Sequence, residues 1–325
     1  MSSFSLITLS YQSGTHTQRC LEALLAQGAT EIIHADNGSS DIDLRALKAR
    51  FPSIIQVDNG ENLGFAAGMN RAAAQAKGDW LGFINPDAFA ESHWLDAMRA
   101  AIIACPDTHI FTALQLDADN PTRMDGAGDA LTGFGFPYRA GFGQPVPADL
   151  QLAEVFAPCG AAFVIHRDLF EALGGFDERL FCYCEDADLG FRARLRGERT
   201  VFVPEAIVHH VGSASLGVRS DFALWHGYRN RFWLFVKNMP LVLLVATLPL
   251  HIGMTLLMAL KDTLKGRAGI VWPALWAGLK GLRPILANRK LIQKTRQISA
   301  LRLAKTLTWS PLKIARRDPD HRRLT

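Results

Sequence analysis

Short runs of apolar residues alternate with amphipathic segments through the first hundred residues of this 325-residue chain. Apolar runs of this length are typical of buried strands, and the segments between them repeat apolar residues at helical spacing, as at Leu21, Leu24 and Leu25. Strands separated by helices predict an α/β fold with a mostly parallel central sheet flanked by helices. The expected strands are 4–9, 30–35, 54–57 and 80–84, and the expected helices are 15–27, 41–51 and 64–77.

The pattern changes past residue 220. Residues 240–260 contain no Asp, Glu, Lys or Arg, and a helix of that length measures about 31 Å, enough to cross the apolar core of a bilayer. Pro249, His251 and Gly253 lie in its middle and favour a bent or in-plane helical hairpin equally well, and a buried helix of a soluble domain is the third interpretation. The expected organisation is a catalytic domain over 1–220, with a nucleotide-binding half (1–115) and an acceptor and catalytic half (116–220), followed by a helical membrane-associating region over 221–325.

Basic residues accumulate in the C-terminal part of the chain. From Lys261 onward there are sixteen Lys and Arg residues against three Asp residues, a charge of +13, and since the whole chain carries +4, residues 1–260 carry −9. Trp272, Trp276 and Trp309 lie among these charges, as in amphipathic helices on anionic lipid. Nucleic acid is the other polyanion that such charge could bind. Because no known nucleic-acid-binding module accompanies the charge, we expect an anionic membrane surface as partner and no nucleic acid.

Polar residues follow the expected strands. Asp36 and Asn37 follow the second strand, Asp58 and Asn59 follow the third, and Asp87 lies just after the fourth. Each cluster alone could be an ordinary turn, since Asn, Asp and Gly favour turns. Ligands of parallel sheets bind beyond the carboxyl ends of the strands, so the repetition of such clusters favours a ligand-binding rim.

Three carboxylates lie within four residues after an aromatic run. Glu185 and Asp186 fall in the first turn of an expected helix, where the unpaired amides stabilise negative charge, and Asp188 stands four residues before Arg192, the spacing of a helical ion pair. An acidic first turn is also common in helices without a catalytic role. The glycine pair at 174–175 ends the preceding helix and favours a shaped loop that delivers these carboxylates.

Residues 117–155 are rich in glycine, proline and aromatic residues. This composition is typical of a flexible loop, and near an active site also of a lid or a sugar pocket. Residues 156–165 then form an apolar run that we expect to return to the sheet.

Five motifs occur together in a specific order. They are DNGSS at 36–40, NLGFAAGMN at 62–70, NPD at 85–87, GGFDE at 174–178 and EDAD at 185–188. In order and approximate spacing these resemble the motifs of family 2 glycosyltransferases of the GT-A fold, most closely the bacterial rhamnosyltransferase-like branch. The resemblance runs from about residue 4 to about residue 231.

The resemblance implies a role for each motif. Asp36 would contact the base of a dTDP- or UDP-sugar, and Asn62, Gly64 and Asn70 would line the nucleotide pocket. Asp87 matches the last aspartate of a metal-binding Asp-x-Asp motif whose first position is Asn85 here, so Mg²⁺ or Mn²⁺ would also depend on diphosphate oxygens and on a second protein ligand. His210 matches that ligand, with His209 as the alternative if the strand register differs by one residue. Gly160 would lie at the donor sugar, and Asp186 would be the catalytic base, with Glu185 as the alternative.

The implied activity is an inverting glycosyltransferase that moves a sugar, with rhamnose as one candidate, onto a lipid-linked or cell-envelope glycan. Two alternatives are a sugar-nucleotide pyrophosphorylase, which would need a basic glycine-rich loop after the first strand, and a non-catalytic membrane scaffold with a relic pocket. Five scattered cysteines match neither a zinc site nor a disulfide framework, and the N-terminal apolar run lacks the features of a signal peptide. The expected location is the cytoplasmic face of a bacterial inner membrane.

Overall fold

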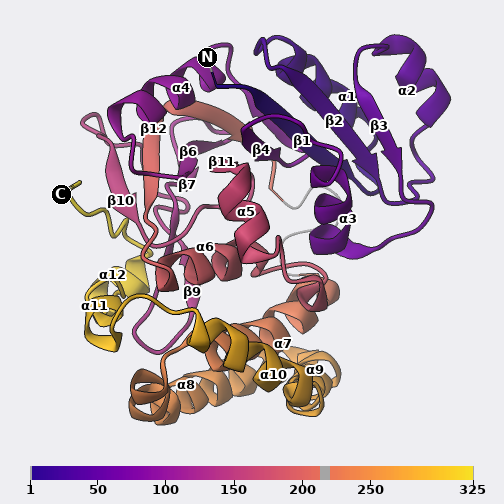
Figure 1. Ribbon diagram of the computed structural model, residues 1–325. Coiled ribbons are helices and arrows are strands. Elements are labelled where there is room, and N and C mark those ends of the chain that lie inside the picture. Colours follow the sequence, from indigo (N-terminus) through magenta and orange to yellow (C-terminus); the bar gives the residue numbers. More distant parts are fainter. Residues whose placement is uncertain (1, 213–219, 325) are drawn as a thin grey trace.

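The computed structural model describes residues 2–212 and 220–324, and the elements alternate as the sequence predicts (Figure 1). The N-terminal elements are β1 (Phe4–Ser10), α1 (Gly14–Leu25), β2 (Glu31–Asp36), α2 (Leu44–Arg50), β3 (Ile55–Asp58), α3 (Gly64–Ala73) and β4 (Trp80–Ile84). The next are β5 (Ala88–Ala90), α4 (Trp94–Ala104), β6 (Ile110–Asp117), β7 (Met124–Gly126), β8 (Asp129–Leu131), β9 (Pro137–Arg139), β10 (Ala153–Val155), β11 (Ala162–His166), α5 (Arg167–Leu173), α6 (Glu185–Leu195) and β12 (Thr200–His210).

The central sheet has the strand order β10-β12-β6-β11-β4-β1-β2-β3, with β5 and β7 paired at its side. β1 pairs in parallel with β2 and β4, and β2 with β3, which confirms the parallel N-terminal half. β11 lies antiparallel between β4 and β6, so the sheet is mixed, although the pairs of its N-terminal half and the β6–β12 pair are parallel. The sequence gives no periodic signal for strand direction, because an apolar buried strand has the same pattern in either orientation.

Helices cover both faces of the sheet. One core packs α1, α2 and α4 against the sheet and includes the fully buried Trp94, and the opposite core packs α3, α5 and α6 and includes Met69 and Leu189. A third core lies between α6 and the C-terminal helices and includes Phe191 and Phe235. Helix α6, which carries the carboxylate motif, is therefore held from two sides, and ten of its eleven residues are buried.

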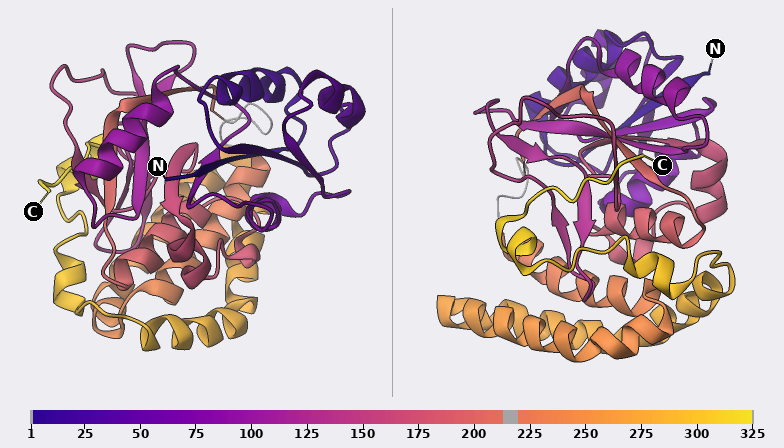
Figure 2. Two further views of the ribbon diagram at one scale, coloured as in Figure 1. Left: turned by 45° about the horizontal axis from the view of Figure 1, so that its top comes forward. Right: turned by 90° about the vertical axis from the view of Figure 1, so that its left-hand side faces the viewer.

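The C-terminal helices form a layer beneath this body (Figures 1 and 2). The layer contains α7 (Asp221–Asn238), α8 (Leu241–Asp262), a π-helical turn (Thr263–Arg267), α9 (Ala268–Lys280) and α10 (Leu282–Lys294), and the tail adds α11 (Ala300–Ala304) and α12 (Pro311–Arg316). The tail then returns to the body, where Thr308 pairs with Thr132 and Arg322 with Glu154. The region after residue 220 is thus packed against the sheet domain at both of its ends.

The glycine-rich segment 117–155 is a packed part of the fold. It forms β7 to β10, and Ala127 and Leu131 within it are fully buried. Gly135 shows why glycine is needed here: its φ is +83°, and a Cβ atom would lie 2.2 Å from Phe235 of α7. The glycines therefore permit close packing, in contrast to the flexible loop or lid that the composition indicates.

Candidate active site

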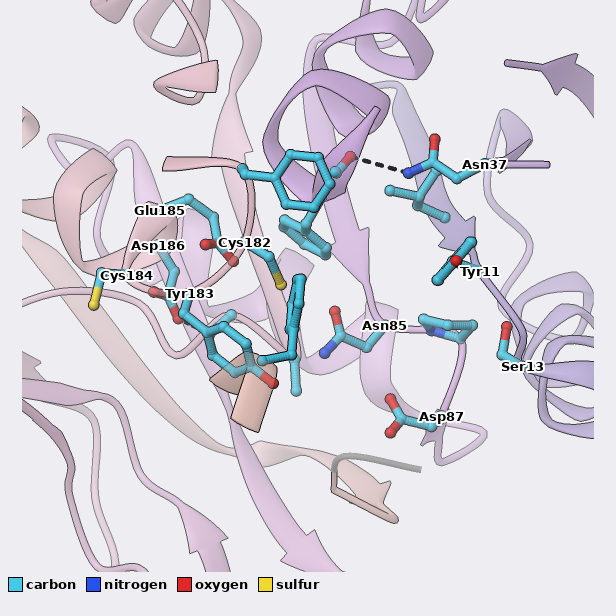
Figure 3. A pocket seen from close by; sticks show the side chains of 18 of the residues that line it. Tyr11, Ser13, Asn37, Asn85, Asp87, Cys182, Tyr183, Cys184, Glu185 and Asp186 are labelled. Atoms are coloured by element: carbon cyan, nitrogen blue, oxygen red, sulfur yellow. Dashed lines mark hydrogen bonds between the residues drawn. The ribbon is translucent and has the colours of Figure 1, made fainter. Parts of the chain in front are cut away.

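A cavity of about 380 Å³ lies beyond the carboxyl ends of β1 and β4. Its size falls within the range of small-molecule sites. Figure 3 shows Tyr11, Ser13 and Asn37 on one side and Tyr183, Glu185 and Asp186 on the other, with Asn85 and Asp87 between them. The lining residues are Leu9, Tyr11, Ser13, Asn37, Asn62, Gly64, Phe65, Asn85, Pro86, Asp87, Arg139, Gly160, Ala161, Phe181, Cys182, Tyr183, Cys184, Glu185, Asp186, His210 and Phe222.

Asp87 and His210 lie together in this cavity. β5 pairs with the end of β12 in a register that sets His210 opposite Ala88, and this brings His210 Nε2 to 3.4 Å from Asp87 Oδ1. His209 points to the other side of the strand, where its Nε2 lies 2.8 Å from Glu91 Oε1. Side chains alternate along a strand, so only one of the two histidines can face the cavity, and it is His210.

Asp125 lies behind His210 and is held in turn by Arg139, which also lines the cavity. The Nδ1 atom of His210 donates to Asp125 Oδ2 at 2.6 Å, and Arg139 donates to the same oxygen at 2.6 Å. Burial alone would lower the pKa of His210, but its hydrogen bonds to Asp125 and Asp87 raise the pKa to about 9. Asp125 thereby fixes the orientation of the ring and leaves Nε2 directed at Asp87. Both residues come from the glycine-rich segment, whose composition gave no signal that singled them out.

The residues around Asp87 fit a divalent cation that takes part of its coordination from its ligand. Within residues 2–212 and 220–324, no group of three His, Cys, Asp or Glu side chains could hold a metal ion alone. Asp87 would supply an oxygen, and His210 would supply Nε2 once the incoming cation has displaced the proton from that atom. The Oδ1 atom of Asn85 nearby is buried and has no hydrogen-bond partner among the described residues. Diphosphate oxygens would complete the oxygen-rich shell that Mg²⁺ or Mn²⁺ prefers.

The loop before α6 has a strained backbone. Phe181, Tyr183 and Cys184 have φ values of +64°, +72° and +69°, a region that residues other than glycine rarely adopt. The fully buried Asn230 of α7 opposes this strain, because its Nδ2 lies 2.8 Å from each of the carbonyl oxygens of Cys182 and Tyr183. The shaped loop that the sequence indicates thus depends on a helix that follows it in the chain.

Glu185 and Asp186 both lie in the first turn of α6, as expected, but their environments differ. Asp186 accepts hydrogen bonds from the backbone N–H groups of Gly160 at 2.8 Å and Ala187 at 2.7 Å. The Oε2 atom of Glu185 is buried and accepts none from the described residues. Burial, followed by the adjacent charge of Asp186, raises the pKa of Glu185 well above its ordinary value. Burial also raises the pKa of Asp186, and the two amides oppose that shift. The two amide hydrogen bonds stabilise the charged form of Asp186, and none from the described residues does so at Oε2 of Glu185, so Asp186 is the better placed of the two carboxylates to act as a base.

Two predicted glycines allow close packing around the carboxylates. A Cβ atom on Gly160 would lie 2.6 Å from Asp186 Oδ2, so only glycine lets this backbone amide reach the carboxylate. Gly64 has a φ of +81°, and a Cβ atom there would lie 2.5 Å from the ring of Phe181. The close approach expected of Gly64 is therefore made to the loop before α6, and both glycines also line the cavity.

Asp36 and Asn70 do not line the cavity, in contrast to the sequence expectation. Asp36 is 1% exposed, and its Oδ1 accepts from the hydroxyls of Ser10 and Ser39 at 2.6 Å each. Asn70 instead fastens the turn before α6, because its Oδ1 accepts from the backbone N–H of Phe176 at 2.8 Å and its Nδ2 donates to the same residue's carbonyl at 2.9 Å.

Two other residues with amide side chains line the cavity. Asn37 and Asn62 both line the cavity, and the Nδ2 of Asn37 donates to Asn62 Oδ1 at 3.4 Å (Figure 3). The same Nδ2 also donates to the carbonyl of Gly64 at 3.0 Å. Within the DNGSS motif at 36–40, Asn37 therefore lines the cavity and the neighbouring Asp36 does not. The family resemblance also extends from His210 to residues 213–215, which lie outside the described residues.

A buried ion cluster connects α6 to α7. Lys237 is 0% exposed, contacts Asp177 through Nζ, and lies 2.7 Å from Asp188 Oδ1. The predicted Asp188–Arg192 pair is confirmed at 2.8 Å, and Arg179 pairs with Asp177 at 2.6 Å. Burial alone would raise the pKa values of Asp177 and Asp188, but Lys237 and the arginines lower both below their ordinary values. Asp188 is thus committed to this cluster and is not available to a substrate.

The fold is that of solved glycosyltransferases. The crystal structure of S. aureus TarS residues 1–349 has a TM-score of 0.54 at 15% sequence identity and covers 90% of this chain and 88% of that chain. GalNAc-T7, solved with UDP, GalNAc and Mn²⁺, has a TM-score of 0.56 at 16% identity and covers 73% of this chain and 51% of that chain. The protein therefore has the GT-A architecture, which confirms the expected fold class.

The sequence narrows the class further. Residues 2–229 match the family described as Glycosyltransferase like family 2, and the chain belongs to that family. N-acetylglucosaminyl-diphospho-decaprenol L-rhamnosyltransferase of Mycobacterium tuberculosis (strain CDC 1551 / Oshkosh) is 29% identical over 236 residues, 65% of this chain and 77% of that protein. O-antigen biosynthesis protein RfbC of Myxococcus xanthus is 27% identical over 234 residues, 68% of this chain and 18% of that protein. The protein is a glycosyltransferase, as the motifs predicted.

Proposed function

We propose that this enzyme transfers a sugar, with rhamnose as the first candidate, from a dTDP- or UDP-sugar to a lipid-linked or cell-envelope glycan, with inversion at the anomeric carbon. The observation that carries the proposal is the position of Asp186, a carboxylate held by two backbone amides in the same cavity as Asp87 and His210. A base and an anion-neutralising group in one cavity are what a single displacement at a sugar phosphate requires. The Mycobacterium relative's name, which describes rhamnosyl transfer to a decaprenyl-linked sugar, supports this choice of donor and acceptor.

Each wall of the cavity has a separate task. Asn37, Asn62 and Tyr11 would hold the nucleotide at the ends of β1 and β2, which assigns nucleotide binding to residues 1–115. Asp87 and His210 would hold Mg²⁺ or Mn²⁺ at the diphosphate, where the cation would neutralise the charge of the leaving group. Acceptor binding and proton transfer would fall to residues 116–220, with α7 and later helices as the attachment region.

Asp186 would take the proton of the acceptor hydroxyl. The hydroxyl oxygen forms a bond to the anomeric carbon while the bond from that carbon to the nucleotide diphosphate breaks, and the diphosphate leaves with the electron pair. The hydroxyl becomes acidic only as the new bond forms, so an ionised carboxylate can receive the proton late in the step. Glu185 is less suited to this task because no amide of the described residues stabilises a charge on its buried Oε2 atom.

Membrane attachment would place the enzyme beside its acceptor. Among the described residues, the helical stretch Leu241–Lys280 is long and apolar enough to cross a membrane, and most of its apolar part is not buried in the protein. Together with the basic tail, this supports association with an anionic membrane surface at the cytoplasmic face of a bacterial inner membrane.

The test is transfer by Asp186→Asn, with Glu185→Gln as the matched control. Asp186→Asn keeps the shape of the side chain and removes its basicity, so transfer to a polyprenyl-diphosphate-linked sugar should fall about 10²–10⁴-fold. Donor nucleotide binding, measured by calorimetry, should change little in both variants. Near wild-type transfer by Asp186→Asn together with loss of transfer in Glu185→Gln would assign the base to Glu185.

A further inference from the structure

Helix α8 runs antiparallel to α7 and contacts it at several points. At the C-terminal end of α8 the hydroxyl of Tyr228 donates to Asp262 Oδ2 at 2.8 Å, and at its middle the ring of His251 stacks on Phe235 with the ring centroids 4.0 Å apart. His251 also donates from Nδ1 to the carbonyl of Phe134, in the glycine-rich segment, at 2.8 Å. One face of α8 is therefore fixed to the body of the enzyme.

Helix α7 is in turn fixed to the catalytic elements. Asn230 holds the loop before α6, and Lys237 holds Asp188 within α6. Helix α9 packs against α7 beside α8, and the indole N–H of Trp233 donates to the carbonyl of Gly278 at 2.8 Å. To cross a bilayer, α8 would have to leave these contacts or carry the buried charges of α7 into the hydrocarbon, where charge is costly.

The opposite face of the α8–α9 hairpin is apolar and exposed. The spacing of Val242, Val245 and Leu260 puts them on the side of α8 away from His251. Leu264 in the turn is 89% exposed and Trp276 of α9 is 58% exposed. Isolated exposed apolar residues are ordinary, but a continuous row over two helices marks a binding surface. Figure 2 shows α8 at the lower edge of the molecule with its long axis along that edge.

Basic residues border this apolar face. Lys261, Lys265 and Arg267 lie at the turn between the helices, and Lys280 lies at the far end of α9, where its Nζ is 5.5 Å from the ring centre of Trp276. An apolar face bordered by lysine, arginine and tryptophan complements the anionic surface of a bilayer. If the partner of this face were a protein, we would expect the charges that border the face to be less uniformly positive.

We infer that the α8–α9 hairpin lies in the plane of the membrane, with its outer face in the headgroup region of an anionic bilayer and without crossing it. The inference rests on the proposed membrane attachment and specifies its geometry. Phe222 at the start of α7 lines the cavity, and the α8–α9 turn lies at that end of the helical layer, because Tyr228 contacts Asp262. The enzyme would therefore hold its cavity one helix layer from the lipid, within reach of a lipid-linked acceptor.

Spin-label depth measurements on the full chain bound to phosphatidylglycerol vesicles test this geometry. Labels would be attached at Val242→Cys, Leu250→Cys, Leu257→Cys and Leu264→Cys, with Ile103→Cys on α4, which is 80% exposed, as the control. The unsubstituted chain measures background labelling of its own cysteines. An in-plane hairpin gives all four positions a similar shallow depth of about 5–10 Å, and leaves position 103 in water. A depth that rises to a maximum near the middle of α8 and falls again on the far side would show a spanning helix and overturn the inference.

A binding assay separates this inference from the proposed function. Leu257→Glu should weaken binding to phosphatidylglycerol vesicles about tenfold or more, because it removes a leucine side chain that the bilayer would bury. Ile103→Glu should leave vesicle binding unchanged. Equal binding by wild type and Leu257→Glu would place the attachment elsewhere and overturn the inference. Transfer to a water-soluble acceptor analogue would still be expected in that case, so the proposed chemistry would stand.

Discussion

Replacement of Lys237 by methionine tests how the active-site helix is held. The substitution keeps much of the length of the side chain and removes the ammonium group that lies between Asp177 and Asp188. Removing one partner of a buried ion pair typically costs about 3–5 kcal/mol, because the other charge stays buried. We expect the lower end of this range, about 3 kcal/mol, since Arg179 still pairs with Asp177 and Arg192 with Asp188. Lys77→Met is the matched control, because Lys77 is exposed and should contribute less than about 0.5 kcal/mol.

A double substitution isolates the contribution of the pair. The double variant Lys237→Met/Asp177→Asn removes the carboxylate of residue 177 together with the lysine that it contacts. The free energy of unfolding should therefore fall by less than the sum of the two single changes, with a coupling energy of about 1–3 kcal/mol. Urea unfolding of the full chain in detergent, with α6 packing followed through the near-ultraviolet signal, measures each value. Additive changes would mean that Lys237 and Asp177 contribute independently, and would refute the ion-cluster argument.

The same cluster predicts a pH dependence. The pKa values of Asp177 and Asp188 are lowered in the folded protein, so their contribution to stability is fully present above the ordinary aspartate pKa of about 3.9. It is lost as the pH falls through the lowered folded values. The stability advantage of wild type over Lys237→Met should therefore be constant from pH 7 to about pH 5 and shrink below about pH 4. An advantage that is unchanged at low pH would contradict this origin.

Two further substitutions test the cavity. Asp87→Asn should abolish the metal-dependent part of UDP or dTDP binding in calorimetry and leave metal-free binding nearly unchanged, and an unaltered metal dependence would remove Asp87 from the site. Asn230→Leu should leave the buried carbonyls of Cys182 and Tyr183 without their donor, at about 1–3 kcal/mol for each group, and should lower kcat far more than it weakens donor binding. An equal loss of kcat and donor affinity would indicate general unfolding and not displacement of the catalytic loop.

The sequence alone determined the local elements and the positions of the motifs. Hydrophobic spacing identified the strands and helices of the first hundred residues, and the first turn of α6 was located at Glu185 and Asp186 because a helix start has a local chemical signature. The Asp188–Arg192 pair was predictable for the same reason, since both residues lie on one helix. Periodicity and spacing report the environment of a residue relative to its near neighbours in the chain.

Tertiary structure decided which of these residues meet. The register of β5 on β12 decides that His210 and not His209 faces the cavity. Asn37 lines the cavity and Asp36 does not, because the Asp36 carboxylate is bound by the hydroxyls of Ser10 and Ser39. Asp125 behind His210 and Lys237 behind α6 come from distant segments with no motif of their own. A buried charge is tolerated only where partners from other elements converge on it, and that convergence is set by the packing of sheet and helices, which no local pattern contains.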